Sequence, residues 1–108
     1  MNEILEFVEE RDWGQFHSPE NLAKSISIES AELLELFQWS KAGESAKSAD
    51  LEAVKNELAD VMTYCLLLAN RLDADPVQIM KDKLEITRKK YPVEKFKGVS
   101  AKYDQIPD

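Results

Sequence analysis

Apolar side chains recur at helical spacing along most of this sequence, and no segment shows the strict alternation that a half-buried strand requires. Helix start signals accompany the pattern, because Ser18 and Asp75 each precede a proline, which suits the first position of a helix. Gly43 supplies a stop signal. We therefore expect an all-α four-helix bundle with short links. Its helices are predicted over residues 2–12, 19–41, 51–73 and 76–91, the third with Asp50 as its N-cap.

The segments outside these helices are short. Residues 13–20, WGQFHSPE, are expected to form an aromatic loop that leads into the second helix. Residues 1–92 are predicted to form one helical domain, and residues 93–108 a C-terminal arm that is extended or poorly ordered. A chain of 108 residues buries only a small core. We therefore expect it to complete that core by oligomerisation.

The charge of the chain restricts its partners. A formal net charge of -7 argues against binding to a DNA or RNA polymer, which needs a basic face. A nucleotide remains possible if a divalent cation lies between the two negative partners. The start, MNEILEFVEERD, carries acids where a signal peptide has a basic flank, and no apolar run reaches the ~18 residues that span a bilayer. The expected compartment is the cytoplasm, without membrane attachment. Cys65, within an apolar stretch, is expected to be buried.

Carboxylates interrupt the apolar stripes of two predicted helices. In the second helix, Leu22, Ile26, Leu33 and Leu36 mark an apolar seam, and Glu29 occupies the position that completes it. Glu32 follows Glu29 at the spacing that places side chains next to each other, and Glu35 extends the row. In the third helix, Glu57 and Asp60 repeat this spacing within a stripe that also holds Ala53, Tyr64 and Leu67.

These two acidic pairs indicate a metal site. Burial of unpaired carboxylates is costly, and crowding of like charges adds repulsion, so the acids must be exposed, protonated or neutralised by cations. Oxygen ligands without histidine suit Mg²⁺, or Mn²⁺, better than zinc or iron. Mg²⁺ commonly shares its coordination with phosphate oxygens, which favours a phosphorylated substrate. The alternative is that the acids only solvate helix surfaces, as most helical acids do.

With its flanking motifs, the acidic pattern resembles the MazG-like, all-α nucleoside triphosphate pyrophosphohydrolases, most closely their dCTP pyrophosphatase branch. Glu29-x-x-Glu32 and Glu57-x-x-Asp60 match the acidic signature, and the similarity extends from about Phe7 to Pro92. The flanking motifs that carry it are ERDWxQFHxPxNL at residues 10–22, ELFQW at 35–39, ELADV at 57–61 and KYP at 90–92.

The resemblance implies a fold, a reaction and a set of site residues. It implies Mg²⁺ held by Glu29, Glu32, Glu57 and Asp60, and hydrolysis between the α and β phosphates to a monophosphate and pyrophosphate. A role in nucleotide-pool housecleaning and assembly as dimers or paired dimers are also implied. Aromatic residues that bind the base and sugar in the family match Trp13, His17, Trp39 and Tyr64. Two positions differ, because Ile4 replaces a histidine of the dCTP branch and Thr87 replaces a frequent asparagine, which leaves the preferred base open.

The remaining candidate residues follow from the chemistry of such a reaction. Phosphoryl transfer needs an in-line water, a proton acceptor and cations near the leaving group. Glu32 and Glu35 are both candidates for the proton acceptor. Lys83 is the preferred phosphate ligand among the lysines and arginines of the fourth helix, whose alternative role is to complement the helix dipole. Phe16 joins Trp13, His17 and Trp39 as a candidate stacking surface for a base, with core packing as the alternative.

Two other functions are compatible with parts of the pattern. A non-catalytic helical module could present its acidic rows to a basic partner. A carboxylate-bridged di-iron bundle would need Glu-x-x-His pairs, which neither acidic helix contains.

Overall fold

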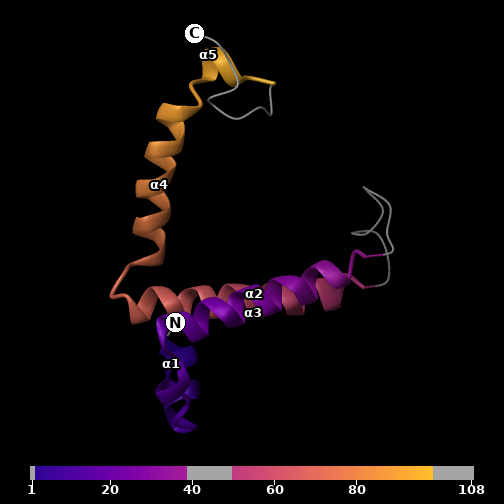
Figure 1. Cartoon of the computed structure of the whole chain (residues 1–108), viewed down its shortest axis with the longest axis vertical. Coiled ribbons are helices and arrows are strands. Elements are labelled where there is room, and N and C mark those ends of the chain that lie inside the picture. The colour runs from indigo at the N-terminus through magenta and orange to yellow at the C-terminus, as the bar shows by residue number, and fades with distance from the viewer. Residues whose placement is uncertain (1, 39–49, 99–108) are drawn as a thin grey trace. The chain divides into compact units, whose positions relative to one another are not determined.

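The protein is described by a computed structural model over residues 2–38 and 50–98 (Figure 1). Its regular elements are α1 (Asn2–Glu10), the 3₁₀ helix η1 (Trp13–Phe16), α2 (Pro19–Glu35), α3 (Leu51–Arg71), α4 (Pro76–Lys90) and α5 (Val93–Phe96). Every regular element in these two ranges is helical, which confirms the all-α prediction for the part described. The chain divides into two compact units, residues 1–74 and 75–108, and each unit is described by itself.

The predicted start signals of α2 and α4 are confirmed. The Ser18 hydroxyl accepts a hydrogen bond from the Asn21 amide at 3.1 Å, and Pro19 takes the first helical position. Asp75 Oδ1 accepts from the amides of Val77 and Gln78 at 3.0 and 3.3 Å. In both cases the side chain satisfies amides that lack a partner within the helix. Asp50 does precede α3, but its side chain makes no capping hydrogen bond.

The predicted end of the second helix was wrong, and the predicted aromatic loop is partly helical. Helix α2 ends at Glu35 rather than at Lys41, because the amides of Leu36, Phe37 and Gln38 bond to carbonyl oxygens three residues back, which tightens the chain out of the α-helix. Residues 39–49, with the predicted stop at Gly43, lie outside the described residues. The aromatic loop after α1 contains η1, whose Trp13 ring contacts the Phe7 ring of α1.

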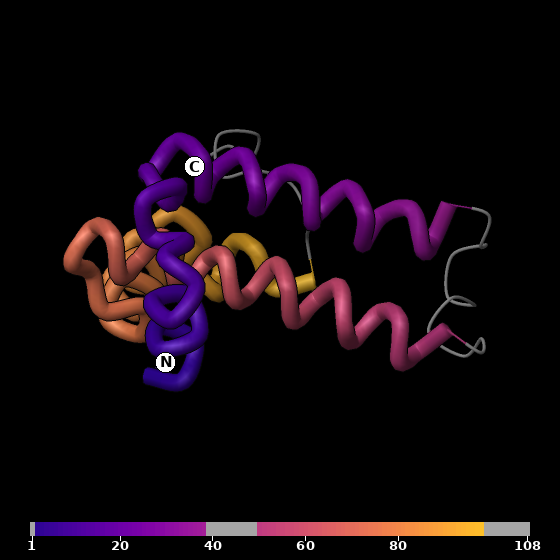
Figure 2. The backbone as a smooth tube through the Cα atoms, turned by 90° about the horizontal axis from the view of Figure 1, so that it is seen from below, coloured from indigo at the N-terminus to yellow at the C-terminus, as the bar shows by residue number. Residues whose placement is uncertain are grey.

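Helices α2 and α3 form an antiparallel hairpin and lie side by side along their length (Figure 2). The core lies near one end of this hairpin, where Leu22, only 1% exposed, and Leu67 and Ala69 are buried. Leu5 and Val8 of α1 line a small cavity of about 90 Å³ together with Leu22 and Leu67. The first helix therefore covers the end of the hairpin that holds most of the buried apolar side chains.

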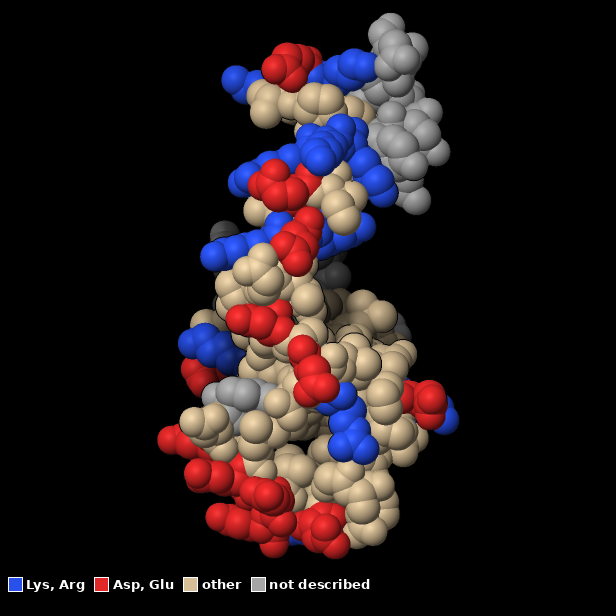
Figure 3. Space-filling view, turned by 90° about the vertical axis from the view of Figure 1, so that its left-hand side faces the viewer, with Lys and Arg blue, Asp and Glu red and all other residues tan. Residues whose placement is uncertain are grey.

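The C-terminal unit contains α4 and α5. The predicted arm begins with the single helical turn α5, where an extended or poorly ordered segment was expected, and the Phe96 ring meets the Tyr91 ring edge-on at 4.8 Å. Lysine and arginine side chains gather over α4 (Figure 3), with Arg88, Lys89 and Lys90 in its last turn. Positive side chains at this end of the helix are stabilised by the negative C-terminal end of the helix dipole.

Two further findings bear on the sequence predictions. Cys65 is exposed on α3, so the prediction of a buried thiol was wrong. Within the apolar run around it, Leu67 and Ala69 are buried, whereas Met62 and Cys65 are exposed. None of the described helices is long and apolar enough to cross a membrane.

Candidate functional site

Three of the four predicted metal ligands converge between α2 and α3. One carboxylate oxygen from each of Glu29, Glu57 and Asp60 lies within 4.8 Å of the other two. Glu57 and Asp60 are neighbours because they are three positions apart on one helix, and the hairpin places Glu29 of α2 against them. The convergence predicted from the interrupted seams is therefore present for these three acids.

The acidic group lacks the partners that would make its burial tolerable. The Oε2 atoms of Glu29 and Glu57 are buried and have no hydrogen-bond partner among the described residues. The pKa of Glu29 is raised from 4.5 to about 7, mainly by burial and in addition by hydrogen bonding to Glu32 and Glu57 and by charge repulsion from Glu32 and Asp60. The site therefore favours either a proton or a cation on Glu29 at neutral pH.

No basic side chain compensates this group within the described ranges. The ion pairs found there join Arg11 to Glu10, Lys55 to Glu52 and Arg88 to Glu85, all at exposed positions. Lys55, which belongs to the same helix as Glu57, is thus engaged elsewhere. An oxygen-only set of ligands with two partnerless buried oxygens fits a hard divalent cation such as Mg²⁺.

The two candidate proton acceptors lie differently with respect to this group. Glu32 is exposed and near enough to Glu29 to raise its pKa, although its carboxylate is not one of the three that meet within 4.8 Å. Glu35 is exposed at the last residue of α2. Of the two, Glu32 is the one with an identified interaction with the acidic group.

A pocket of about 180 Å³ adjoins the acidic group and brings together three of the predicted nucleoside-binding residues. Trp13, His17 and Tyr64 line it, and Asp60 belongs to both the pocket and the acidic group. The Trp13 ring is held by an edge-on contact with the Phe7 ring at 5.4 Å. The full lining is Ile4, Phe7, Val8, Trp13, His17, Asp60, Thr63, Tyr64 and Leu67.

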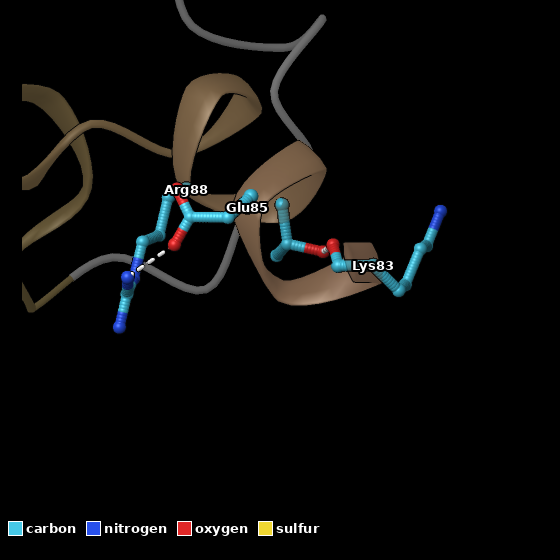
Figure 4. Close-up of polar contacts among 4 residues, drawn as sticks. Lys83, Glu85 and Arg88 are labelled. Carbon is cyan, nitrogen blue, oxygen red and sulfur yellow. Dashed lines mark hydrogen bonds and ion pairs between the residues drawn. The ribbon is translucent and has the colours of Figure 1, made fainter. Parts of the chain in front are cut away.

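The other three predicted substrate-binding residues are Phe16, Trp39 and Lys83. Phe16 belongs to η1 but is 59% exposed and is not part of the lining. Trp39 lies outside the described residues. Lys83 is exposed on α4, in the other unit, and its side chain extends away from the ion pair of Glu85 and Arg88 (Figure 4).

The sequence interpretation missed part of the pocket lining. Phe7 and Val8 enter from α1, and no local pattern could place them there because the docking of α1 on the hairpin is a tertiary effect. Thr63 could have been found, since it follows Asp60 by three residues and precedes Leu67 by four on the stripe already identified. Ile4, at which the dCTP branch has a histidine, also belongs to the lining.

Together these features define a class of protein: an all-α domain in which an acidic centre on a helical hairpin adjoins an aromatic pocket. The chain belongs to the MazG-like family, whose model matches residues 24–106. This confirms the resemblance inferred from the motifs. The chain is 40% identical to dCTP pyrophosphatase 1 of Mus musculus and 39% identical to that of Homo sapiens, and both alignments cover 94% of this chain. They cover 62% of each relative, so the chain spans less than two thirds of their length.

A solved structure shows the same fold. The crystal structure of a pyrophosphatase from Archaeoglobus fulgidus aligns with a TM-score of 0.78 at 41% sequence identity, and the alignment covers 84% of this chain and 87% of that one.

Proposed function

We propose that this protein is a magnesium-dependent nucleoside triphosphate pyrophosphohydrolase that converts a (d)NTP to a (d)NMP and pyrophosphate. The observation that carries the proposal is the convergence of Glu29, Glu57 and Asp60, with two buried oxygens lacking partners, beside a pocket that shares Asp60. The names of the relatives, dCTP pyrophosphatase 1 and an archaeal pyrophosphatase, support the same reaction class.

The proposed metal ligands are Glu29, Glu57 and Asp60, with Glu32 as the fourth carboxylate that the family resemblance implies. When bound, Mg²⁺ neutralises charge on the phosphate oxygens at which negative charge develops. Mn²⁺, which accepts the same oxygen ligands, could take its place. The hairpin supplies the rigid support, because each ligand projects from a regular turn of α2 or α3.

Glu32 is the proposed proton acceptor, through a carboxylate oxygen that the metal ion leaves free. A general base must lie within reach of the attacking water and remain able to take its proton. Glu32 is exposed at the edge of the acidic group, whereas the Glu29 and Glu57 oxygens turn inwards. Glu35 lies one turn further along α2, at its end, and is the weaker candidate for this reason.

The pocket is the proposed nucleoside site. Trp13 and Tyr64 offer aromatic surface to a base or sugar, and His17 offers a ring nitrogen. The proposal leaves the base unassigned, because Ile4 in the lining presents no hydrogen-bonding group to a base edge. Trp39, Phe16 and Lys83 remain predicted contributors from the sequence.

We further propose that the protein acts as a homodimer or a dimer of dimers and serves nucleotide-pool housecleaning. Only Leu22, Leu67 and Ala69 are buried hydrophobic residues in the described ranges, while many large apolar side chains of α2, α3 and α4 are exposed. A second copy of the chain is the partner that would cover them, as expected for a short helical chain.

The test is a panel of ribo- and deoxyribonucleoside triphosphates, canonical and modified, assayed with Mg²⁺ for pyrophosphate and orthophosphate. Glu57→Gln and Asp60→Asn keep the side-chain volume and remove a charged ligand. Because the proposed ligands act together on one ion, each variant should lower the rate of pyrophosphate release by at least about 100-fold.

Glu52→Gln is the matched control, since Glu52 is an exposed acid of the same helix whose contact is an ion pair with Lys55. It should retain the wild-type rate. Orthophosphate as the first product, or undiminished turnover in both ligand variants, would refute the proposed reaction or the proposed site.

A further inference from the structure

The stripe of α3 that supplies the acidic group continues along the wall of the nucleoside pocket. Asp60, Thr63, Tyr64 and Leu67 all line this pocket. Side chains three or four residues apart are neighbours on a helix, so Thr63 lies about one turn beyond Asp60 in the direction of Leu67. Asp60 is shared with the acidic group. Thr63 is therefore a polar residue at the junction between the acidic group and the pocket.

The hydroxyl group of Thr63 makes no hydrogen bond within the described ranges of the chain. The contrast is with Thr87 in α4, whose hydroxyl donates to the Lys83 carbonyl oxygen at 3.0 Å. Such a bond to the preceding turn is the usual way in which a helical threonine satisfies its hydroxyl. Thr63 is half-buried, and its hydroxyl lacks this compensation.

Most of the remaining wall is apolar or aromatic, from α1, η1 and the far end of the α3 stripe. The polar side chains are few, namely those of His17, Asp60, Thr63 and Tyr64. In a nucleoside triphosphate the sugar joins the phosphates to the base. If the phosphates reach the acidic group at Asp60, the sugar is the part of the nucleotide that lies next along α3. A hydroxyl group at Thr63 can both donate to and accept from a sugar hydroxyl.

We propose that Thr63 is a specificity-determining residue whose hydroxyl group hydrogen-bonds to the sugar 2′-hydroxyl, which only a ribonucleotide carries, and so shifts the preference towards ribonucleotides. The proposal rests on the proposed function, because it takes the phosphates to be held beside Asp60. The inference adds that Thr63 recognises the sugar, a part of the substrate that neither the acidic signature nor the aromatic residues specify.

The experiment compares kcat/KM for a deoxyribonucleotide and the ribonucleotide of the same base in three proteins: the wild type, Thr63→Val and Thr63→Ser. The valine variant removes the hydroxyl and keeps the shape, while the serine variant keeps the hydroxyl. A net hydrogen bond contributes about 0.5–1.5 kcal/mol, so the valine variant should raise the deoxy-to-ribo ratio by about 2- to 13-fold, mainly through a higher KM for the ribonucleotide. The serine variant should keep the ratio within about twofold.

The outcomes separate this inference from the proposed function. If the wild type releases pyrophosphate but the valine variant keeps the wild-type ratio, the role of Thr63 is refuted and the enzymatic function stands. An equal change in the serine variant would assign the effect to packing and refute the hydrogen bond. A change in base ranking at constant sugar would show that Thr63 contacts the base, and would refute the proposal too. If the wild type cleaves no nucleotide in the panel, both proposals fail.

The fold of each variant is checked by circular dichroism and thermal unfolding. If Thr63→Val does not fold, Thr63→Ala removes the same hydroxyl group without the added methyl, and the deoxy-to-ribo ratio decides in the same way.

Discussion

The Glu29 carboxyl group occupies a position in the α2 seam at which an apolar side chain would pack. Its Oε2 atom is buried without a partner in the described part of the chain, and burial, followed by the neighbouring acids, raises its pKa to about 7. The sequence predicted Glu29 as a site residue because this acid occupies the position that completes the apolar seam of α2. It did not predict the pKa, which depends on how closely α3 approaches and on which oxygens turn inwards.

This raised pKa gives a pH-dependent stability in the metal-free protein. Between pH 4.5 and about 7 the unfolded chain ionises at Glu29 while the folded protein keeps the proton. The folded state then binds more protons, so stability from this group is complete below pH 4.5 and is lost as the pH rises towards 7. Thermal unfolding in the presence of a chelator should show Tm falling over this range in the wild type relative to Glu29→Gln.

Glu35→Gln serves as the control for this measurement, because Glu35 is an exposed acid of the same helix. This variant should show the same dependence of Tm on pH as the wild type. Added Mg²⁺ should raise Tm more at pH 8 than at pH 5, since the ion replaces the proton on the ligands. Parallel Tm profiles for the wild type and Glu29→Gln would contradict the assignment of a raised pKa to this residue.

At the scale of the elements, helix starts were predictable and other features were not. Ser18 and Asp75 each carry the capping group and the proline that define a start, so the information is local. The end of α2 at Glu35 and the turn η1 are different, because apolar periodicity continues through Leu36 in the sequence and only packing decides where the helix stops. Cys65 was misplaced for a related reason: an apolar run does not say which of its residues face the neighbouring helix.

The α2–α3 hairpin depends on few buried side chains, which gives a prediction for Leu22. This residue is 1% exposed and lies where α1 covers the hairpin. Leu22→Ala should lower the free energy of unfolding by about 2–5 kcal/mol, because it removes buried surface and leaves a cavity. Leu72→Ala, at a position that is 60% exposed, should cost less than about 1 kcal/mol.

Chemical denaturation of the wild type and both leucine variants measures these changes in the free energy of unfolding. Comparable losses at the two positions would mean that Leu22 is not the main packing contact of the hairpin. Because the acidic group is built from both helices of the hairpin, Leu22→Ala should also weaken the Mg²⁺ dependence of Tm if the loosened core lets α2 and α3 separate.

For the molecule as a whole, exposed apolar surface is the dominant unexplained feature. On α4, Val77, Met80 and Leu84 follow one another at helical spacing, while Ile79 and Ile86 lie on another side of the same helix. A helix that is apolar on more than one side is typically buried by more than one neighbour. The proposed second copy of the chain accounts for such a surface, whereas single exposed apolar residues would need no explanation.

Met80, which is 62% exposed, is a suitable position to test this assembly. Sedimentation velocity should show the wild type as a dimer or tetramer, and Met80→Glu should shift it towards a smaller species because a charge buried in an apolar contact is costly. Glu85→Gln, which alters an exposed ion pair on α4, should leave the assembly intact. If dimerisation and folding are coupled, Tm of the wild type should rise with protein concentration and that of Met80→Glu should not. A wild-type monomer at all concentrations, or an unchanged assembly in Met80→Glu, would show that this side of α4 is not an interface between copies.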